Sequence, residues 1–210
     1  KEQKNIRVLT AHTGNDRAET LIMNLSRGSD LIGLSNLREE RILDGNIKLI
    51  RPLLEFSRDE TEKICRKMNL PIWIDPSNKN LNFTRNKIRH EVLPLLESLH
   101  IGCTSRISSL AERLSWYQED QTELVLLALQ TIKTNQGLTR KKIINLPLST
   151  RRIILAKWLE INQIPGINSK ILEEISYKIS QEEITGSINL KDGWIIKLTK
   201  ESIEMFNVKN

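Results

Sequence analysis

Hydrophobic and polar positions follow two different patterns at the start of the chain. Residues 6–11 form a short, largely apolar run with β-branched members, which predicts a buried strand. Residues 17–27 instead place apolar side chains at helical spacing, and Gly28 stands where a left-handed cap would end that helix. A strand that leads directly into a helix predicts an α/β layer. The apolar helix positions are Ala18, Leu21, Ile22 and Leu25.

The next segment carries a second strand and a second helix. Residues 47–50 are a short apolar run, which predicts the strand. Ser57 and Glu60 have the spacing of a capping box, and the helix they open is expected to turn Ile64, Cys65 and Met68 inward. Residues 71–78 then read as a strand followed by a turn.

The remainder of the chain predicts helices first and strands last. A long helix is expected from Ser105, with further helices over residues 151–161 and 169–179. After Gly186 the period changes to that of strands, with the Asp192-Gly193 pair as the turn between them. We therefore predict three parts: residues 1–100 in an α/β domain, residues 101–148 as a helical connector, and residues 149–210 as a small α+β domain. The apolar positions of the long helix are Ile107, Leu110, Ala111, Leu114, Tyr117, Leu124 and Ala128.

Composition narrows the class of protein. The 210 residues hold 39% hydrophobic and 28% charged side chains, as is usual for a globular protein, and no apolar run approaches the roughly 18 residues that cross a bilayer. Cys65 and Cys103 are far apart, which indicates two reduced thiols rather than a disulfide framework or a zinc site. The net charge of +6 favours a polyanionic partner.

One acidic pair lies at the predicted turn from strand to helix. Asp16 and Glu19 are three residues apart, so their carboxylates share a face of the first helical turn, and His12 precedes them in the loop. Helix capping alone, with Asp16 at the N-cap and Glu19 at N3, would explain the pair. All three residues nevertheless fall at the carboxyl end of a strand, where open α/β sheets bind ligands. We therefore predict a pocket for a cationic ligand.

A basic motif, RNKIRH, follows at residues 85–90. On a helix, Arg85 and Arg89 share one face and can bind phosphate through two hydrogen bonds each. The alternative is a solvated helix face with Glu91 and Glu97 as partners.

A second basic segment lies between Leu124 and Leu159, which enclose no acidic residue. Such a segment would neutralise several phosphates and make binding depend on salt; alternatively, some of its side chains only solvate the surface. Its members are Lys133, Arg140, Lys141, Lys142, Arg151, Arg152 and Lys157.

Five motifs occur in the order found in one family. AHTGNDRAET, NLSRGSDLIGL, IRPLLEFSR, DPSN and FTRNKIRHEVLPLL, between Val8 and Leu99, resemble the tRNA(Ile)-lysidine synthases. The last 60 residues, including SINLKDGWIIKL, are also similar to the small C-terminal substrate domain of that family. The resemblance implies the C-terminal part of a doubly wound, adenine nucleotide alpha hydrolase-like domain, as in other N-type ATP pyrophosphatases.

The family's reaction implies substrates and roles for these residues. ATP adenylates the cytidine at the first anticodon position of tRNA(Ile), and free lysine then displaces AMP to give lysidine, which changes codon reading from AUG to AUA. The resemblance implies that Asp16 and Glu19 hold the lysine substrate and that His12 lines the reaction centre. It further implies ATP and Mg²⁺, a cytoplasmic or plastid-stroma location without a membrane, and a possible homodimer. Expected contacts with ATP or tRNA phosphates are Arg27, Arg85, Asn86, Arg89 and His90; expected tRNA contacts are Arg140, Lys141, Lys142, Arg151 and Arg152.

The sequence departs from the family in two places. Asn15 and Arg17 replace a second Asp and a Gln, which is expected to put a cation next to the acidic pair. The S-G-G-x-D-S loop that cradles ATP does not occur in the 210 residues, and we expect it upstream of Lys1, within a longer protein. This polypeptide alone is then expected not to turn over ATP. A non-catalytic tRNA-binding module and a related tRNA-thiolating ATP pyrophosphatase are the alternatives, although the cysteines do not fit the latter.

Overall fold

The structure is a computed structural model that describes residues 6–35, 37–73, 75–181 and 185–208. Its contacts group the chain into two compact units, Lys1–Glu119 and Asp120–Asn210. The boundary falls within the long helix α6 (Cys103–Ile132), which therefore contributes to both units. The three-part division predicted from the sequence stays a prediction.

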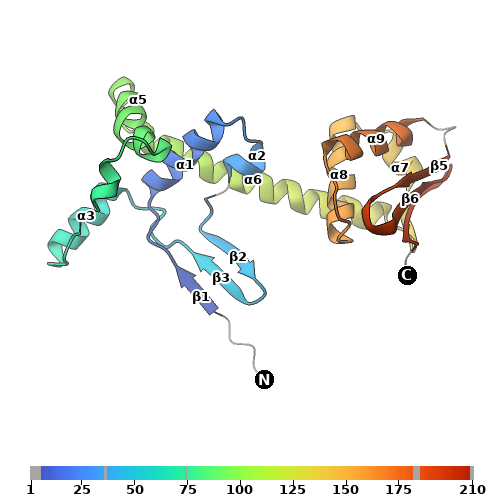
Figure 1. Cartoon of the computed structure of the whole chain (residues 1–210), viewed down its shortest axis with the longest axis horizontal. Coiled ribbons are helices and arrows are strands. Elements are labelled where there is room, and N and C mark those ends of the chain that lie inside the picture. Colours follow the sequence, from blue (N-terminus) through green and yellow to red (C-terminus); the bar gives the residue numbers. More distant parts are fainter. Residues whose placement is uncertain (1–5, 36, 74, 182–184, 209–210) are drawn as a thin grey trace. The chain divides into compact units, whose positions relative to one another are not determined.

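A small sheet and a set of helices make up the first unit (Figure 1). The sheet has the order β1-β3-β2, in which β1 (Ile6–Leu9) and β3 (Ile47–Ile50) are parallel and β2 (Glu40–Asp44) is antiparallel to β3. Strand β3 is the predicted one. Strand β2 was not predicted, although the Asp44-Gly45 pair between β2 and β3 is a hairpin signal.

The prediction that the first strand is buried is wrong. All four residues of β1 are exposed, and Leu9 keeps 64% of its surface. The reason is that β1 lies at one end of the strand order and pairs only with β3 among the described residues. An apolar run shows that a strand can be buried, but burial itself depends on what covers its faces and its free edge.

Helix α1 (Gly14–Ser26) begins three residues before the predicted start, because Thr13 rather than Asp16 is the N-cap. It packs through Ala18 against Ile88 and Leu93, which form the buried apolar cluster of this unit. The neighbouring elements are α2 (Leu31–Leu34), α3 (Arg58–Lys67), η1 (Pro76–Lys79), α4 (Thr84–Lys87), the π-helical turn η2 (Ile88–Val92) and α5 (Leu93–Leu99).

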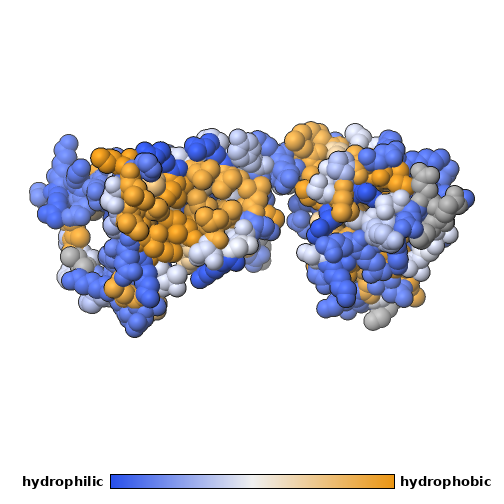
Figure 2. All heavy atoms as spheres, turned by 90° about the horizontal axis from the view of Figure 1, so that it is seen from above, coloured by the Kyte–Doolittle hydropathy of each residue, from blue (hydrophilic) through white to orange (hydrophobic). Residues whose placement is uncertain are grey.

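Two expectations for residues 57–78 are wrong. Helix α3 has the predicted Ser57 cap, but none of its ten residues, all described, is buried, and Ile64 keeps 42% of its surface. The strand expected after it is absent over residues 71–73, the described part before a gap at Ile74. These segments therefore lie on the surface of the first unit, where Figure 2 also shows hydrophobic residues gathered on one face over its helices.

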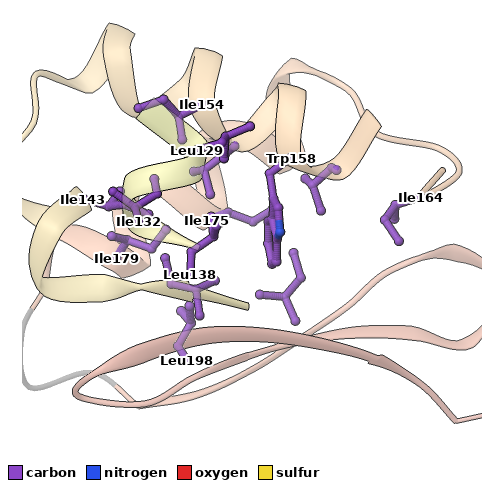
Figure 3. Packing of buried hydrophobic residues seen from close by; sticks show 14 of the residues in the cluster. Leu129, Ile132, Leu138, Ile143, Ile154, Trp158, Ile164, Ile175, Ile179 and Leu198 are labelled. Atoms are coloured by element: carbon purple, nitrogen blue, oxygen red, sulfur yellow. The ribbon is translucent and has the colours of Figure 1, made fainter. Parts of the chain in front are cut away.

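The second unit contains the larger core. Its antiparallel sheet has the order β4-β7-β6-β5, and helices α8 and α9 pack with it around a cluster of sixteen buried apolar residues. In Figure 3, Ile175 and Trp158 reach from helices toward the sheet residues Leu138 and Leu198. The predicted helices and strands occur here, together with two strands that were not predicted, β4 and β7. The elements are β4 (Gly137–Thr139), α7 (Arg140–Ile144), α8 (Leu148–Ile161), α9 (Ser169–Ser180), β5 (Gly186–Asn189), η3 (Lys191–Gly193), β6 (Trp194–Leu198) and β7 (Ser202–Asn207).

Candidate functional site

A capped helix start places the acidic pair just beyond β1. Thr13 is in an extended conformation, with φ −106° and ψ 174°, and Asp16 occupies position N3. The Asp16 Oδ2 atom accepts hydrogen bonds from the Thr13 backbone N–H at 2.8 Å and from the Thr13 hydroxyl at 2.9 Å. A second tie joins this turn to the segment after β3, because the Gly14 N–H donates to the Phe56 carbonyl at 2.8 Å. The turn is therefore fixed on both sides.

Three arginines surround the other carboxylate oxygens. Arg89 binds Glu19 through both edges of its guanidinium, with Nε to Oε1 at 2.8 Å and Nη2 to Oε2 at 3.0 Å. Arg85 bridges the pair, with Nε to Glu19 Oε2 at 2.8 Å and Nη2 to Asp16 Oδ1 at 3.0 Å. Arg58 makes the longest hydrogen bonds to these carboxylates, 3.3 Å to Glu19 and 3.2 Å to Asp16, and Arg89 also lies 3.6 Å from Asp16 Oδ1. Three cations thus face two anions at this site.

The arginine contacts keep both carboxylates ionised. Burial raises the pKa of Asp16, but the hydrogen bonds from Thr13 and the charges of Arg58 and Arg85 together bring that pKa below its ordinary value. Burial likewise raises the pKa of Glu19, whose side chain is 0% exposed, but hydrogen bonds from Arg89 and Arg85 lower it overall. The hydrogen bond to Glu19 raises the pKa of Arg89. The cluster is therefore a set of fixed charges.

The basic motif reaches the acidic pair because of its local fold. Arg85 lies on α4 and Arg89 on η2, a π-helical turn of the kind that often marks functional sites. The Asn86 side chain holds the preceding loop by donating to the carbonyls of Ser77 and Asn80, each at 2.9 Å. The loop therefore fixes the position from which both arginines extend.

Three other residues expected to contact phosphate, Asn86, His90 and Arg27, differ in how accessible their side chains are. Asn86 is 7% exposed and both donors of its amide are used by backbone carbonyls, which argues against the expected phosphate contact there. His90 is exposed, and its Nε2 lies 2.9 Å from the Asn78 carbonyl oxygen. Arg27 is the exposed C-cap residue of α1. For His90 and Arg27 the contact stays a prediction.

His12 belongs to the same electrostatic neighbourhood. Its Nδ1 lies 2.9 Å from the Thr10 hydroxyl, and the ring is half-buried. Burial lowers the pKa of His12, and the charges of Arg51 and Arg85 lower it further, against the opposing effect of Asp16. The imidazole is therefore neutral at physiological pH and can accept a proton there.

Asn15 and Arg17, the two residues that depart from the family pattern, make contacts that the sequence did not predict. Arg17 does not stand beside the acidic pair, so that expectation is wrong: it is 5% exposed and its Nη1 lies 3.8 Å from Glu55 and 3.7 Å from Glu112. Asn15 instead supports the site, because its Oδ1 accepts the backbone N–H of Arg58 at 2.8 Å. This bond fixes the start of α3, and with it the base of the Arg58 side chain.

An open cavity of about 600 Å³ borders this cluster. Leu54 and Leu93 contribute apolar wall, while Arg17, Arg58 and Arg89 contribute cations. Carboxylates outnumber these cations over the described residues, which makes the cavity acidic. They are Glu19, Glu55, Asp59, Glu60, Glu97 and Glu112.

Two of the five residues expected to contact tRNA are buried in the second unit. Arg140 is 1% exposed and donates to the carbonyls of Lys178, Gln181 and Thr199 at 3.0, 2.6 and 2.7 Å. Arg151 is 9% exposed and donates to the Ser176 carbonyl at 3.1 Å. These guanidiniums hold the fold together, which argues against the expected tRNA contact for both. The remaining three, Lys141, Lys142 and Arg152, reach the surface.

Arg58 is the main site residue that the sequence reasoning missed. It sits in the block IRPLLEFSR and directly after the Ser57 cap, which is a signal for a helix start rather than for a charged site. Its partners are 39 and 42 positions away in the sequence. The block order was the one available signal that this segment belongs with Asp16 and Glu19.

Comparisons with known proteins agree with the order of the motifs. Residues 1–96 match the model of the PP-loop domain. The chain is 54% identical to a tRNA(Ile)-lysidine synthase of Prochlorococcus marinus over 96% of its own length and 60% of the relative. A second P. marinus tRNA(Ile)-lysidine synthase is 49% identical, over 97% of the chain and 63% of the relative.

A tRNA(Ile)-lysidine synthase of Parasynechococcus marenigrum is 44% identical, over 94% of the chain and 60% of the relative. The chain thus spans about three fifths of the length of these curated relatives. Over the described residues, no helix is long and apolar enough to cross a membrane. The chain is therefore similar to tRNA(Ile)-lysidine synthases along nearly its whole length, and its first 96 residues match the PP-loop domain.

Proposed function

We propose that this chain acts in tRNA(Ile)-lysidine synthase, which uses ATP to ligate free lysine to the cytidine at the first anticodon position of tRNA(Ile). The product, lysidine, changes codon reading from AUG to AUA. The observation that carries the proposal is the ionised Asp16–Glu19 pair beside a neutral His12, at the carboxyl end of β1. The similarity to tRNA(Ile)-lysidine synthases supports it, and catalysis belongs to the whole protein.

Each residue of the cluster has a role in this proposal. Asp16 and Glu19 attract the ε-ammonium of lysine, a compact cation that carboxylates hold well. That ammonium must lose a proton before its nitrogen can attack the adenylated cytidine, and the neutral imidazole of His12 is suited to accept it. Arg85 and Arg89, with Arg58, bring a surplus positive charge for the phosphates of ATP or tRNA.

The nucleotide and the metal are supported less directly. The PP-loop match supports the use of ATP, with Arg27, Arg85, Arg89 and His90 as the proposed phosphate contacts. The described residues do not fit a Mg²⁺ site, because they contain no group of three or more His, Cys, Asp or Glu side chains that could hold an ion, and arginines occupy the carboxylates of the pair.

The second unit offers a smaller tRNA surface than the sequence predicted. Lys141, Lys142 and Arg152 are the proposed contacts with the phosphates of tRNA(Ile). These side chains already have partners within the protein: Lys142 Nζ donates to the Thr131 carbonyl at 2.7 Å, and Arg152 forms an ion pair with Glu173 at 3.3 Å. Exchange of such partners for phosphate would make the affinity depend on salt.

The wider architecture is part of the proposal. Residues 1–100 would be the C-terminal part of a doubly wound, adenine nucleotide alpha hydrolase-like domain. Residues 101–148 would be its helical connector and residues 149–210 a small α+β domain that binds the substrate tRNA. We further propose a homodimer in the cytoplasm or a plastid stroma.

Incorporation of labelled lysine into tRNA tests the function. The protein made from the full reading frame, with ATP, is expected to label a tRNA(Ile) transcript with the anticodon CAU and not one with UAU. A Glu19→Gln variant should lose the activity, while Glu62→Gln on the exposed surface of α3 should keep it. A protein that binds the CAU transcript but never labels it would be the non-catalytic tRNA-binding module instead.

A further inference from the structure

The acceptor positions of the acidic pair are all in use. A carboxylate offers about four lone-pair sites, two on each oxygen. Asp16 receives two donors on Oδ2 from Thr13 and two on Oδ1 from Arg85 and Arg58. Glu19 receives Arg89 and Arg58 on Oε1, and Arg85 and Arg89 on Oε2. A substrate ammonium can therefore bind this pair only after one of these donors leaves.

Arg58 is the donor that is held least firmly. Its three contacts with the pair measure 3.2, 3.3 and 3.4 Å, whereas Arg85 and Arg89 each make a 2.8 Å bond to Glu19. The side chain of Arg58 is 38% exposed, close to the 36% of Arg85 and above the 19% of Arg89, so the bond lengths are what separate Arg58 from Arg85. Charge-assisted bonds weaken with length, so displacement of Arg58 costs the least.

The surroundings allow the side chain of Arg58 to move while its backbone stays in place. Its N–H is held by Asn15 at 2.8 Å, but α3 buries none of its ten residues, all of them described. Arg85 and Arg89, by contrast, flank Ile88, which is 5% exposed and belongs to the apolar cluster of the unit. Arg58 also borders the acidic cavity, which gives its guanidinium space and other carboxylates to approach.

We propose that Arg58 is a placeholder for the substrate: in the free protein its guanidinium occupies the place on Asp16 and Glu19 that the ε-ammonium of lysine takes on binding. This inference rests on the proposed function and adds a specificity-determining residue to it. A ligand without a terminal cation cannot replace the ion pairs that Arg58 makes with Asp16 and Glu19, so Arg58 stays bound to them. The placeholder thus selects for a cationic side chain and sets the affinity for lysine.

Calorimetric titration of the full chain with L-lysine and with norleucine tests the placeholder. Arg58→Ala and Arg58→Gln are expected to bind lysine about tenfold more tightly than the unmodified chain, because one competing ion pair has been removed. Arg58→Lys should lie near the unmodified chain, since it still supplies a competing cation. Arg66→Ala, on the same helix and paired with Glu62, is the matched control and should change nothing.

Two results would overturn the inference in different ways. Weaker or equal lysine binding by both Arg58→Ala and Arg58→Gln would overturn the placeholder, and weaker binding that Arg58→Lys restores would make Arg58 a positioning residue that holds the pair in shape. Equal binding of lysine and norleucine by every form would remove the lysine site itself, and with it the proposed function. Tighter binding of lysine alone by both variants supports the placeholder.

Discussion

Replacement of Arg140 by alanine separates a structural role from an RNA-binding role. The change removes a 1% exposed guanidinium whose donors reach the carbonyls of Lys178, Gln181 and Thr199. Removal of one partner from a buried, charged hydrogen-bond network costs about 3–5 kcal/mol. A domain of 60–100 residues loses roughly 4–8 °C per kcal/mol, so we expect the second unit to melt on the order of 25 °C lower.

Tryptophan fluorescence during thermal and urea denaturation is a suitable assay, because Trp158 is 3% exposed in the core of the second unit, whereas Trp73 and Trp116 of the first unit are 90% and 54% exposed. Lys141→Ala is the matched control: it changes the next residue of the same helix, whose side chain is 74% exposed, and should shift the free energy of unfolding by less than about 0.5 kcal/mol. An Arg140→Ala protein of unchanged stability that had lost affinity for tRNA would refute the structural assignment.

Three further predictions concern the acidic pair and the basic surface. Glu19→Gln should lower the free energy of unfolding by about 2–4 kcal/mol in denaturant titrations, because it leaves the partly exposed guanidiniums of Arg85 and Arg89 without their buried carboxylate partner. The pKa values of Asp16 and Glu19 are lower in the folded protein than their ordinary values of 3.8 and 4.5. The two ionised carboxylates should therefore stabilise the fold fully above those ordinary values, and this contribution should disappear as the pH falls through the folded-state pKa values. Unfolding curves between pH 2 and 7 will show this loss. Combined alanine substitution of Lys141, Lys142 and Arg152 should weaken tRNA binding. In a plot of the logarithm of the binding constant against the logarithm of the salt concentration, the slope should fall by roughly one per lost phosphate contact.

Each of these predictions can fail. Glu62→Gln, at an exposed ion pair on α3, controls for loss of any carboxylate, and an equal effect there would remove the special status of Glu19. The Glu19→Gln variant should also show a flatter dependence of stability on pH below 4.5. An unchanged salt slope in the triple variant would place the tRNA surface elsewhere.

Short-range signals were enough for many elements of the fold. The Ser57–Glu60 spacing predicted a capping box that the structure contains, and the strand over residues 47–50 was found as predicted. The Asp192-Gly193 turn adopts the left-handed backbone that these residue types tolerate, with φ 57° and 82°. In each case the determinants lie within a few residues of one another.

Burial and partnership could not be predicted in the same way. The exposure of Leu9 depends on which strands and helices cover β1, and the exposure of Ile64 depends on whether α3 packs. Arg140 looked like part of a basic surface because its carbonyl partners are 38 to 59 positions away. The sequence places Asp16 and Glu19 together at a helix start, but the contact of Arg58 with this pair depends on how two distant segments meet.

The unequal cores of the two units have a consequence for ligand linkage. Among the described residues, the apolar cluster of the first unit has three buried members and that of the second has sixteen. The first unit is therefore expected to melt first, and a ligand that binds only its native form would raise that melting temperature by mass action. At one hundred times its dissociation constant such a ligand contributes about 2.7 kcal/mol. The concentration of a ligand that binds the first unit would then set the rate at which proteases cleave that unit.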